Sequence, residues 1–143
     1  MGYDKRLVML KEQYRMHPNI CELINKPVYD GKLRTNELIE KKRLKIAALM
    51  SPQNGALIFC DTSYINPVIL STSSFSRLSP YSAIVSTCLA ERIIEAGKEK
   101  GIEVNIGIVT PYSAQAQLIS KILEDEQIDK KKVVASTIHK VSR

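Results

Sequence analysis

The chain has 143 residues, 44% of them hydrophobic, which predicts one domain with a single packed core. Its 21 basic and 15 acidic side chains give a formal net charge of +6, and a basic balance favours a polyanionic partner. Three widely spaced cysteines argue against a disulfide framework or a zinc site, and no apolar run is long enough to span a bilayer, so we expect a cytosolic protein with no metal site and no membrane partner.

The first part of the chain predicts two strands and two helices. A short apolar run over 6–10 predicts a first strand. Pro18 predicts the start of a helix, because proline at the first helical position loses no hydrogen bond, and Pro27 is expected to end it. Residues 35–50 are compatible with a poorly capped helix. The continuous apolar run 55–61 predicts a parallel strand that is covered on both faces.

The middle of the chain predicts a loop followed by a long helix. Segment 62–79 is rich in serine and threonine and predicts a long surface loop. Ser79 and Pro80 predict the N-cap and first residue of a helix that Gly97 or Gly101 ends. Its apolar stripe is formed by Ile84, Val85, Cys88, Leu89 and Ile93.

The last part predicts a buried strand over 104–109, a helix over 114–126 and a final strand over 133–136. The inward positions of this helix are Leu118, Ile119, Ile122 and Leu123. Strands that alternate with helices of this length predict an α/β fold, with a mainly parallel sheet and helices on both faces. This pattern gives a fold class and no function, because flavodoxin-like and receiver-like domains share it.

Two basic clusters stand out, Lys41-Lys42-Arg43 and Lys130-Lys131-Lys132. We expect each to lie on a solvated helix face or loop.

One candidate ligand-binding run is Gln13-Tyr14-Arg15-Met16-His17-Pro18. Ligands of α/β proteins bind at the carboxyl ends of parallel strands, and this run follows a predicted strand. Tyr14 is suited to stack on a nucleobase, and Arg15 is suited to supply positive charge to a phosphate. The alternative is that both side chains pack the loop against the helix that Pro18 starts.

A second candidate run, Gly107-Ile108-Val109-Thr110-Pro111-Tyr112, ends just before a predicted helix. A hydroxyl, a ring and free backbone amides at a helix start form a workable surface for a sugar-phosphate or a stacked base. The alternative is a strand-to-helix turn that Pro111 makes rigid, with Tyr112 packed as a lid.

These two runs, about ninety residues apart, resemble two motifs of the superfamily 1 helicases, in the branch of the nonsense-mediated-decay and DNA-replication helicases. The match is to the second of that family's two RecA-like domains. The resemblance therefore implies a RecA-like fold of the P-loop NTPase type: a three-layer sandwich with a mainly parallel sheet. Over residues 1–143 this domain would be partial, truncated at its C-terminal end.

The resemblance also implies roles for individual residues. Gln13, Tyr14 and Arg15 would bind ATP, with Tyr14 on the adenine and Arg15 acting catalytically at the γ-phosphate. Thr110, Pro111 and Tyr112 would lie on the path of the single strand.

Residues 136–140 resemble the start of the motif that couples nucleotide to nucleic acid, which makes Thr137 and His139 further nucleic acid contacts. For His139 the alternative is a turn histidine. Ser142 and Arg143 stand where the family has glutamine and glycine, so those two roles are not carried over. The simplest expectation is a fragment that ends inside this motif.

The family's phosphate-binding loop, Gly-Lys followed by Ser or Thr, and a strand ending in Asp-Glu are both absent from the sequence. ATP and magnesium would then be bound mainly by a first RecA-like domain elsewhere in a parent chain, and these residues alone are expected to be inactive. The leading hypothesis is an ATP-dependent helicase that translocates on single-stranded DNA or RNA and unwinds duplexes. The alternatives are a non-catalytic nucleic-acid-binding or regulatory module and a generic nucleotide-binding α/β domain.

Overall fold

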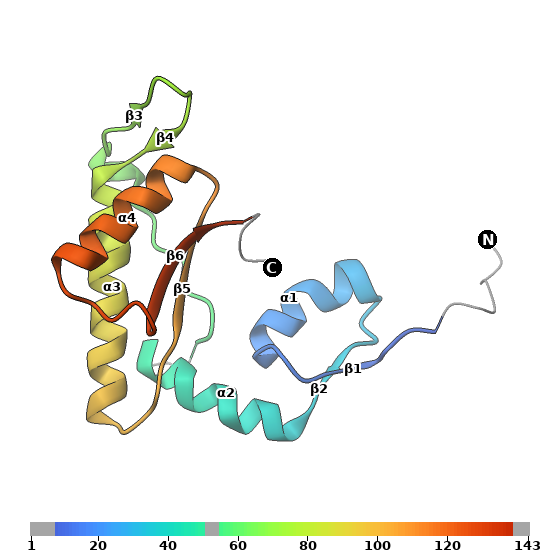
Figure 1. Ribbon diagram of the computed structural model, residues 1–143. Helices are drawn as coiled ribbons and strands as arrows, with labels where there is room; N and C mark the ends of the chain where they lie inside the picture. The colour runs from blue at the N-terminus through green and yellow to red at the C-terminus, as the bar shows by residue number, and fades with distance from the viewer. Residues whose placement is uncertain (1–7, 51–54, 139–143) are drawn as a thin grey trace, which may run out of the picture. The chain divides into compact units, whose positions relative to one another are not determined.

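The computed structural model describes residues 8–50 and 55–138, and the chain divides into two compact units, Met1–Phe59 and Cys60–Arg143. The first unit contains β1 (Glu12–Gln13), α1 (Pro18–Tyr29), β2 (Arg34–Thr35) and α2 (Glu37–Met50), as Figure 1 shows. The second contains a short 3-10 helix (Ser63–Ile65), β3 (Leu70–Ser71), β4 (Arg77–Leu78), α3 (Pro80–Glu99), β5 (Ile106–Thr110), α4 (Ser113–Asp125) and β6 (Val133–Thr137).

In the first unit, β1 and β2 pair in parallel, with Gln13 opposite Thr35. The strand expected over 6–10 is wrong for its described part, since residues 8–10 form no strand and the pairing begins at Glu12. Residues 6 and 7 lie outside the described residues. A strand forms only where a partner strand supplies hydrogen bonds. Because the partner β2 has only two residues, only Glu12 and Gln13 are paired, just after the predicted run.

Helix α1 begins at Pro18 as predicted, with His17 as its N-cap. The prediction that Pro27 ends it is wrong, because Pro27 lies inside the helix, which continues to Tyr29. Asp30 adopts a left-handed conformation with φ of 51°, and its backbone N–H donates to the carbonyl of Asn25. This cap stabilises the final turn, which forms although Pro27 supplies no backbone N–H to the helix.

Helix α2 confirms the helix expected within 35–50, but it is better capped than the sequence suggested. The side chain of Asn36 accepts from the backbone N–H of Leu38 at 3.0 Å, and its carbonyl accepts from Ile39 and Glu40. Asparagine is a favoured N-cap because its side chain replaces a missing helical acceptor.

The parallel strand expected over 55–61 is wrong. These residues form no strand, and the side chains of Leu57, Ile58 and Phe59 are 52%, 56% and 91% exposed. An apolar run of strand length becomes a strand only beside a pairing neighbour, which the local sequence does not provide.

The second unit is built on the parallel pair β5–β6, whose five register pairs run from Ile106 opposite Val133 to Thr110 opposite Thr137. Helices α3 and α4 pack together against one face of this pair (Figure 1). The buried core consists of Ala83, Ala90, Ile119, Leu123 and Val133, with Ile106, Ile108 and Ala135 packed against it. This confirms the α/β class with parallel strand pairing and the inward positions predicted for α4.

Strand β5 departs from the prediction of a buried strand, because its residues alternate between half-buried and exposed positions as far as Val109. Val109 and Val134 are 52% and 56% exposed. Their exposure follows from the period of two along a strand, since α3 and α4 cover only the other face within this unit.

Helix α3 begins at Pro80 after the N-cap Ser79, as predicted, but its apolar stripe is not its buried face. Ile84 and Leu89 are 54% and 48% exposed, and Cys88 is also exposed. The face that packs in the core instead carries small residues, among them Ala83 and Ala90. Small side chains let α3 approach α4 closely, and this close packing decides which face is buried.

Glycine is required at both positions that were predicted to end α3, for different reasons. Gly101 has φ of 63° just after the helix ends, which confirms its predicted role. Gly97 lies inside the helix and is buried. A Cβ at Gly97 would lie 2.7 Å from Cγ2 of Val104 and 2.8 Å from the carbonyl of Ile102. The backbone therefore needs glycine there for close packing.

The loop expected over 62–79 contains an antiparallel hairpin in which Leu70 pairs with Leu78 and Ser71 with Arg77. Thr72 closes its turn, because its N–H donates to the carbonyl of Ser76 and its Oγ1 accepts from the N–H of Ser76. The prediction of a loop throughout 62–79 is therefore wrong for Leu70–Ser71 and Arg77–Leu78. Two-residue strands leave too short a pattern for the sequence to reveal.

Candidate nucleotide and nucleic acid sites

Gln13 organises the turn that carries the first motif. Its side chain is buried, with 8% of its surface exposed. Its amide nitrogen donates to the carbonyl of Met16 and to Oγ1 of Thr35, both at 2.8 Å. Its amide oxygen accepts from the backbone N–H groups of Arg15 and Met16 at 2.8 and 2.6 Å. All four positions of the amide are therefore used within this unit. Gln13 fixes the backbone of Arg15, and its direct contact with ATP stays a prediction.

Tyr14 exposes its ring while its hydroxyl is held. The side chain is 59% exposed, and the hydroxyl donates to a carboxylate oxygen of Glu12 at 2.9 Å. Asn36 donates to the other carboxylate oxygen at 3.0 Å. Hydrogen bonds from Asn36 and Tyr14 lower the pKa of Glu12, and the bond to Glu12 raises the pKa of Tyr14. The ring is thereby oriented and accessible for stacking.

Arg15 and His17 follow on the same turn with opposite burial. Arg15 is exposed, whereas His17 is 6% exposed. Nδ1 of His17 accepts from the N–H of Asn19 at 3.1 Å, which caps α1. Arg15 and His17 both line a hollow of about 320 Å³.

The second motif, which ends at Tyr112, and the third, residues 136–140, meet at the ends of β5 and β6, where Thr110 lies opposite Thr137. Thr110 is 7% exposed, and its Oγ1 accepts from the N–H of Tyr112 at 3.4 Å. Thr137 is half-buried. The structure therefore brings these two predicted residues together at the carboxyl ends of parallel strands.

Tyr112 is the N-cap of α4 and is 38% exposed, so its ring is partly packed and partly open. Together with Thr110 and Pro111 it lines a hollow of about 440 Å³. Arg77 and Ser82 line the same hollow. The hollow combines apolar walls, hydroxyl groups and a guanidinium, which are the groups that a nucleotide of a single strand would contact.

Sequence reasoning missed Ser76, which joins the hairpin to the start of α4. Its Oγ accepts from the N–H of Ala114 at 3.1 Å and lies 3.3 Å from Oγ of Ser113. One of the helix-start amides that we expected to be free is therefore already bonded. No local pattern reveals this contact, because the residues lie 38 positions apart.

Gln115 was also missed as a structural residue. It is 8% exposed, and its amide accepts from the backbone N–H of Ser79 at 2.6 Å and donates to the carbonyl of Ser79 at 3.2 Å. These two hydrogen bonds to the backbone of Ser79 fix the start of α3 beside the motif that ends at Tyr112. A polar residue among the inward positions of an amphipathic helix was the available signal.

Thr137 lines a separate hollow of about 340 Å³ with Ser113, Ser120 and Lys121. Gln117, Glu124 and two alanines line the same hollow, so its charged groups are one cation and one anion. His139, the other predicted contact of this motif, lies outside the described residues.

A protein-family model described as an AAA domain matches residues 2–142. The chain is 34% identical over 134 residues to the probable helicase senataxin of Mus musculus, covering 87% of the chain and 4% of that protein. It is 31% identical over 126 residues to the putative ATP-dependent RNA helicase ECM32 of Saccharomyces cerevisiae, covering 85% and 11%. It is 27% identical over 115 residues to a regulator of nonsense transcripts 1 homolog of Drosophila melanogaster, covering 80% and 9%. The chain is an AAA domain of the superfamily 1 helicase family.

This superfamily 1 helicase-family domain corresponds to between 4% and 11% of the length of these three relatives. The family resemblance carried by the first two motifs is thereby confirmed, together with the RecA-like α/β fold. Among the described residues, none of the helices is both long and apolar enough to cross a membrane. The roles of individual site residues and the cytosolic location stay predictions.

Proposed function

We propose that this chain acts as the second RecA-like domain of an ATP-dependent helicase that translocates on single-stranded DNA or RNA and unwinds duplexes. The observation that carries the proposal is the pairing of Thr110 with Thr137, which sets two motifs side by side at the carboxyl end of a parallel sheet. Ligands of α/β folds bind at that end. The names of two relatives, a probable helicase and a putative ATP-dependent RNA helicase, support the same activity.

In this proposal Tyr14 and Arg15 serve ATP. The exposed ring of Tyr14 stacks on the adenine, and the exposed guanidinium of Arg15 neutralises charge that develops at the γ-phosphate. Gln13 supports this role because its amide holds the backbone of Arg15 in one geometry before the nucleotide arrives. A preorganised cation stabilises a transition state more than a mobile one does.

The remaining ATP contacts and the magnesium belong, in this proposal, to a first RecA-like domain of the same protein. The sequence carries no phosphate-binding loop. The described residues also contain no group of three or more His, Cys, Asp or Glu side chains placed to hold a metal ion. Arg15 would therefore reach the nucleotide from the opposite side of a cleft between two domains.

The nucleic acid contacts lie in the second unit. Tyr112 offers a partly exposed ring to a base, while Thr110, Pro111 and Thr137 border the single strand of nucleic acid. The net charge of +6 supports binding to a polyanion.

The test uses a longer protein that contains this domain and a phosphate-binding loop. We expect ATP hydrolysis that single-stranded nucleic acid stimulates, and strand separation that requires ATP. The second candidate function is a non-catalytic nucleic-acid-binding module, which the basic net charge and the partly exposed ring of Tyr112 also fit. It predicts single-strand binding with no hydrolysis, and that result would replace the helicase proposal.

A further inference from the structure

The β3–β4 hairpin presents a single aromatic ring at its tip. The side chain of Phe75 is 92% exposed, and its backbone adopts a left-handed conformation with φ of 60°. A bulky side chain rarely takes this conformation, because its Cβ then crowds the carbonyl oxygen that follows. Neither the exposed ring nor the strained backbone stabilises the folded chain. Backbone strain of this kind concentrates at functional sites.

The turn fixes Phe75 from both sides. The N–H of Phe75 donates to the carbonyl of Thr72 at 3.0 Å. Oγ1 of Thr72 lies 3.0 Å from Oγ of Ser74 and accepts from the N–H of Ser76 at 3.1 Å. The residues before and after Phe75 are therefore bonded to the same threonine, which holds the backbone of Phe75 in place before any ligand arrives.

Strand β4, which follows the tip, is tied to the first turn of α4 at both of its ends. Before the strand, Oγ of Ser76 accepts from the N–H of Ala114 at 3.1 Å. After the strand, Ser79 exchanges two hydrogen bonds with the side-chain amide of Gln115. Ala114 is two residues beyond Tyr112, so these bonds set the hairpin beside the loop that carries Tyr112 (Figure 1).

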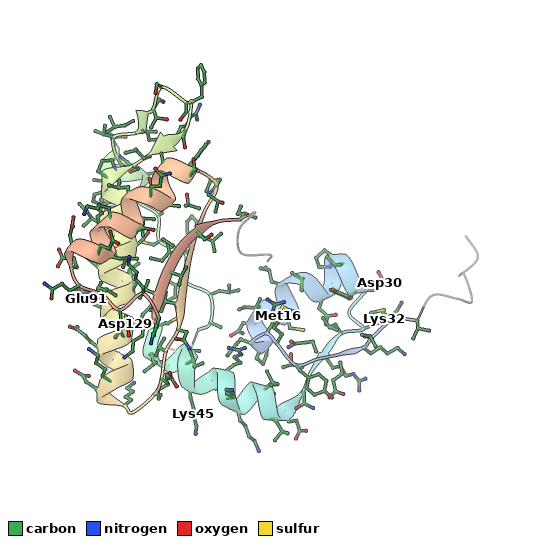
Figure 2. The ribbon with its side chains drawn as sticks, viewed as in Figure 1. Met16, Asp30, Lys32, Lys45, Glu91 and Asp129 are labelled. Carbon is green, nitrogen blue, oxygen red and sulfur yellow. The ribbon has the colours of Figure 1, made fainter. Side chains whose placement is uncertain are left out.

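The charge of this surface favours an anion. Arg77 of β4 is exposed and lines the hollow of about 440 Å³ that Tyr112 also lines. Among the described residues, Arg77 is the only charged side chain in that lining, and no carboxylate forms an ion pair with it. Figure 2 shows the acidic residues Glu91 and Asp129 on a part of this unit away from the hairpin. A polyanion at the hairpin therefore contacts a guanidinium and avoids these two carboxylates.

We propose that Phe75 and Arg77 extend the path of a single-stranded nucleic acid from the Tyr112 loop onto the β3–β4 hairpin. Phe75 stacks on one base, Tyr112 stacks on another, and Arg77 binds a phosphate between them. This order of ring, cation and ring matches a strand in which a phosphate joins each base to the next. The other residues of the turn 72–76 are serine and threonine, so the tip offers one ring and no wider apolar surface for a protein partner. This path rests on the proposed function, because it continues from Tyr112.

The direct test is fluorine NMR of the 143-residue chain labelled with fluorophenylalanine. The sequence contains only two phenylalanines, Phe59 and Phe75, so each gives one signal, and Phe59→Leu assigns them. The ligands are a short single-stranded oligonucleotide and an abasic strand of the same length, which keeps the sugar-phosphates without the bases. We expect the Phe75 signal to shift in a saturable way with the oligonucleotide and much less with the abasic strand. Phe59 is 91% exposed and belongs to the other unit, so its signal is the internal control.

Two variants separate stacking from charge, with affinity measured by fluorescence anisotropy of the oligonucleotide. Phe75→Asn removes the ring, and asparagine tolerates a left-handed backbone. This variant should bind the single strand between about fivefold and a hundredfold more weakly, with no fall in melting temperature. Arg77→Met should reduce the slope of log affinity against log salt concentration by about 0.7, as expected for one lost phosphate contact on a single strand. Arg92→Met removes an exposed arginine of α3 and should leave that slope unchanged.

The hairpin contact is overturned, while the path at Tyr112 stands, if the strand binds without moving the Phe75 signal. Equal shifts of the Phe59 and Phe75 signals, equal shifts with both ligands, or equal salt slopes for Arg77→Met and Arg92→Met also count against it. Unchanged affinity of Phe75→Asn with a lowered melting temperature would make Phe75 a structural residue. If the unmodified chain binds no single strand at all, the nucleic acid part of the proposed function fails together with the hairpin contact.

Discussion

Thr110 and Thr137 lie opposite each other as the last register pair of β5 and β6. The two residues come from different sequence motifs, and only the parallel pairing makes them neighbours. Oγ1 of Thr110 is already bonded to the N–H of Tyr112, so the threonine holds the loop that carries the ring. One end of the sheet thereby joins a positioned aromatic group to the start of the third motif.

The 143-residue chain should not hydrolyse ATP, with or without single-stranded nucleic acid. The physical reason is that a phosphate-binding loop, which supplies backbone amides and a lysine to the phosphates, is absent from the sequence. A phosphate-release assay on the purified chain measures this, with a longer protein that contains the loop as the positive control. Stimulated turnover by the short chain would contradict the proposal that a first RecA-like domain supplies the groups that bind the phosphates.

In a longer protein, Arg15→Ala should lower the turnover rate by about a thousandfold or more while ATP affinity changes little. The guanidinium is proposed to act on charge that develops in the transition state. Steady-state hydrolysis and nucleotide binding on the same variant separate the two effects. Arg92→Ala, which removes an exposed arginine on α3, serves as the control. Normal hydrolysis by the Arg15 variant would remove this residue from the ATP site.

Tyr112→Ala should weaken single-strand binding by about 1 to 3 kcal/mol, because one stacked base loses its aromatic partner. The competing account, in which the half-buried ring only packs the turn, predicts a lower melting temperature with unchanged affinity. Both quantities should be measured on the same variant. Tyr64→Ala removes a tyrosine that is 81% exposed and should change neither. Unchanged affinity with a lowered melting temperature would make the Tyr112 loop structural.

Gln115→Ala should lower the free energy of unfolding by about 1 to 3 kcal/mol. The substitution leaves the N–H and carbonyl of Ser79 without the amide that bonds both of them. Urea denaturation followed by circular dichroism measures the change. Gln117→Ala alters an exposed glutamine on the same helix and is the matched control. If the two variants are equally stable, the double hydrogen bond contributes nothing measurable.

Gly97→Ala should be destabilising by about 1 to 3 kcal/mol, since the added methyl group would lie 2.7 Å from Cγ2 of Val104 and 2.8 Å from a backbone oxygen. Gly107→Ala is the comparison, because among the described residues no heavy atom other than those of Gly107 and its chain neighbours lies within 4 Å of the Cβ position there. Thermal unfolding of both variants gives the difference. A Gly97 variant as stable as the Gly107 variant would show that α3 can move to accommodate the methyl group without loss of free energy of unfolding.

Features that depend on neighbouring residues in the sequence were predictable. Pro18 and Pro80 begin helices because proline fits a first helical turn, and the apolar period of α4 marked its inward side correctly. The first two motifs identified the family because their residues are contiguous. Gln13, Tyr14 and Arg15 lie on one turn, so their proximity also follows from sequence alone.

Contacts between distant segments were decided only by the tertiary structure. The apolar run 55–61 forms no strand, because strand formation requires a partner. Helix α3 buries alanines in place of its larger stripe, because close packing against α4 selects the smaller face. The bonds from Ser76 and Gln115 join residues 36 to 38 positions apart. Arg43 belongs to a basic cluster that was expected to be solvated, but folding leaves it half-buried with its Nε atom buried. Residue type and spacing determine local conformation, whereas burial and partner choice depend on which surfaces meet after the chain folds.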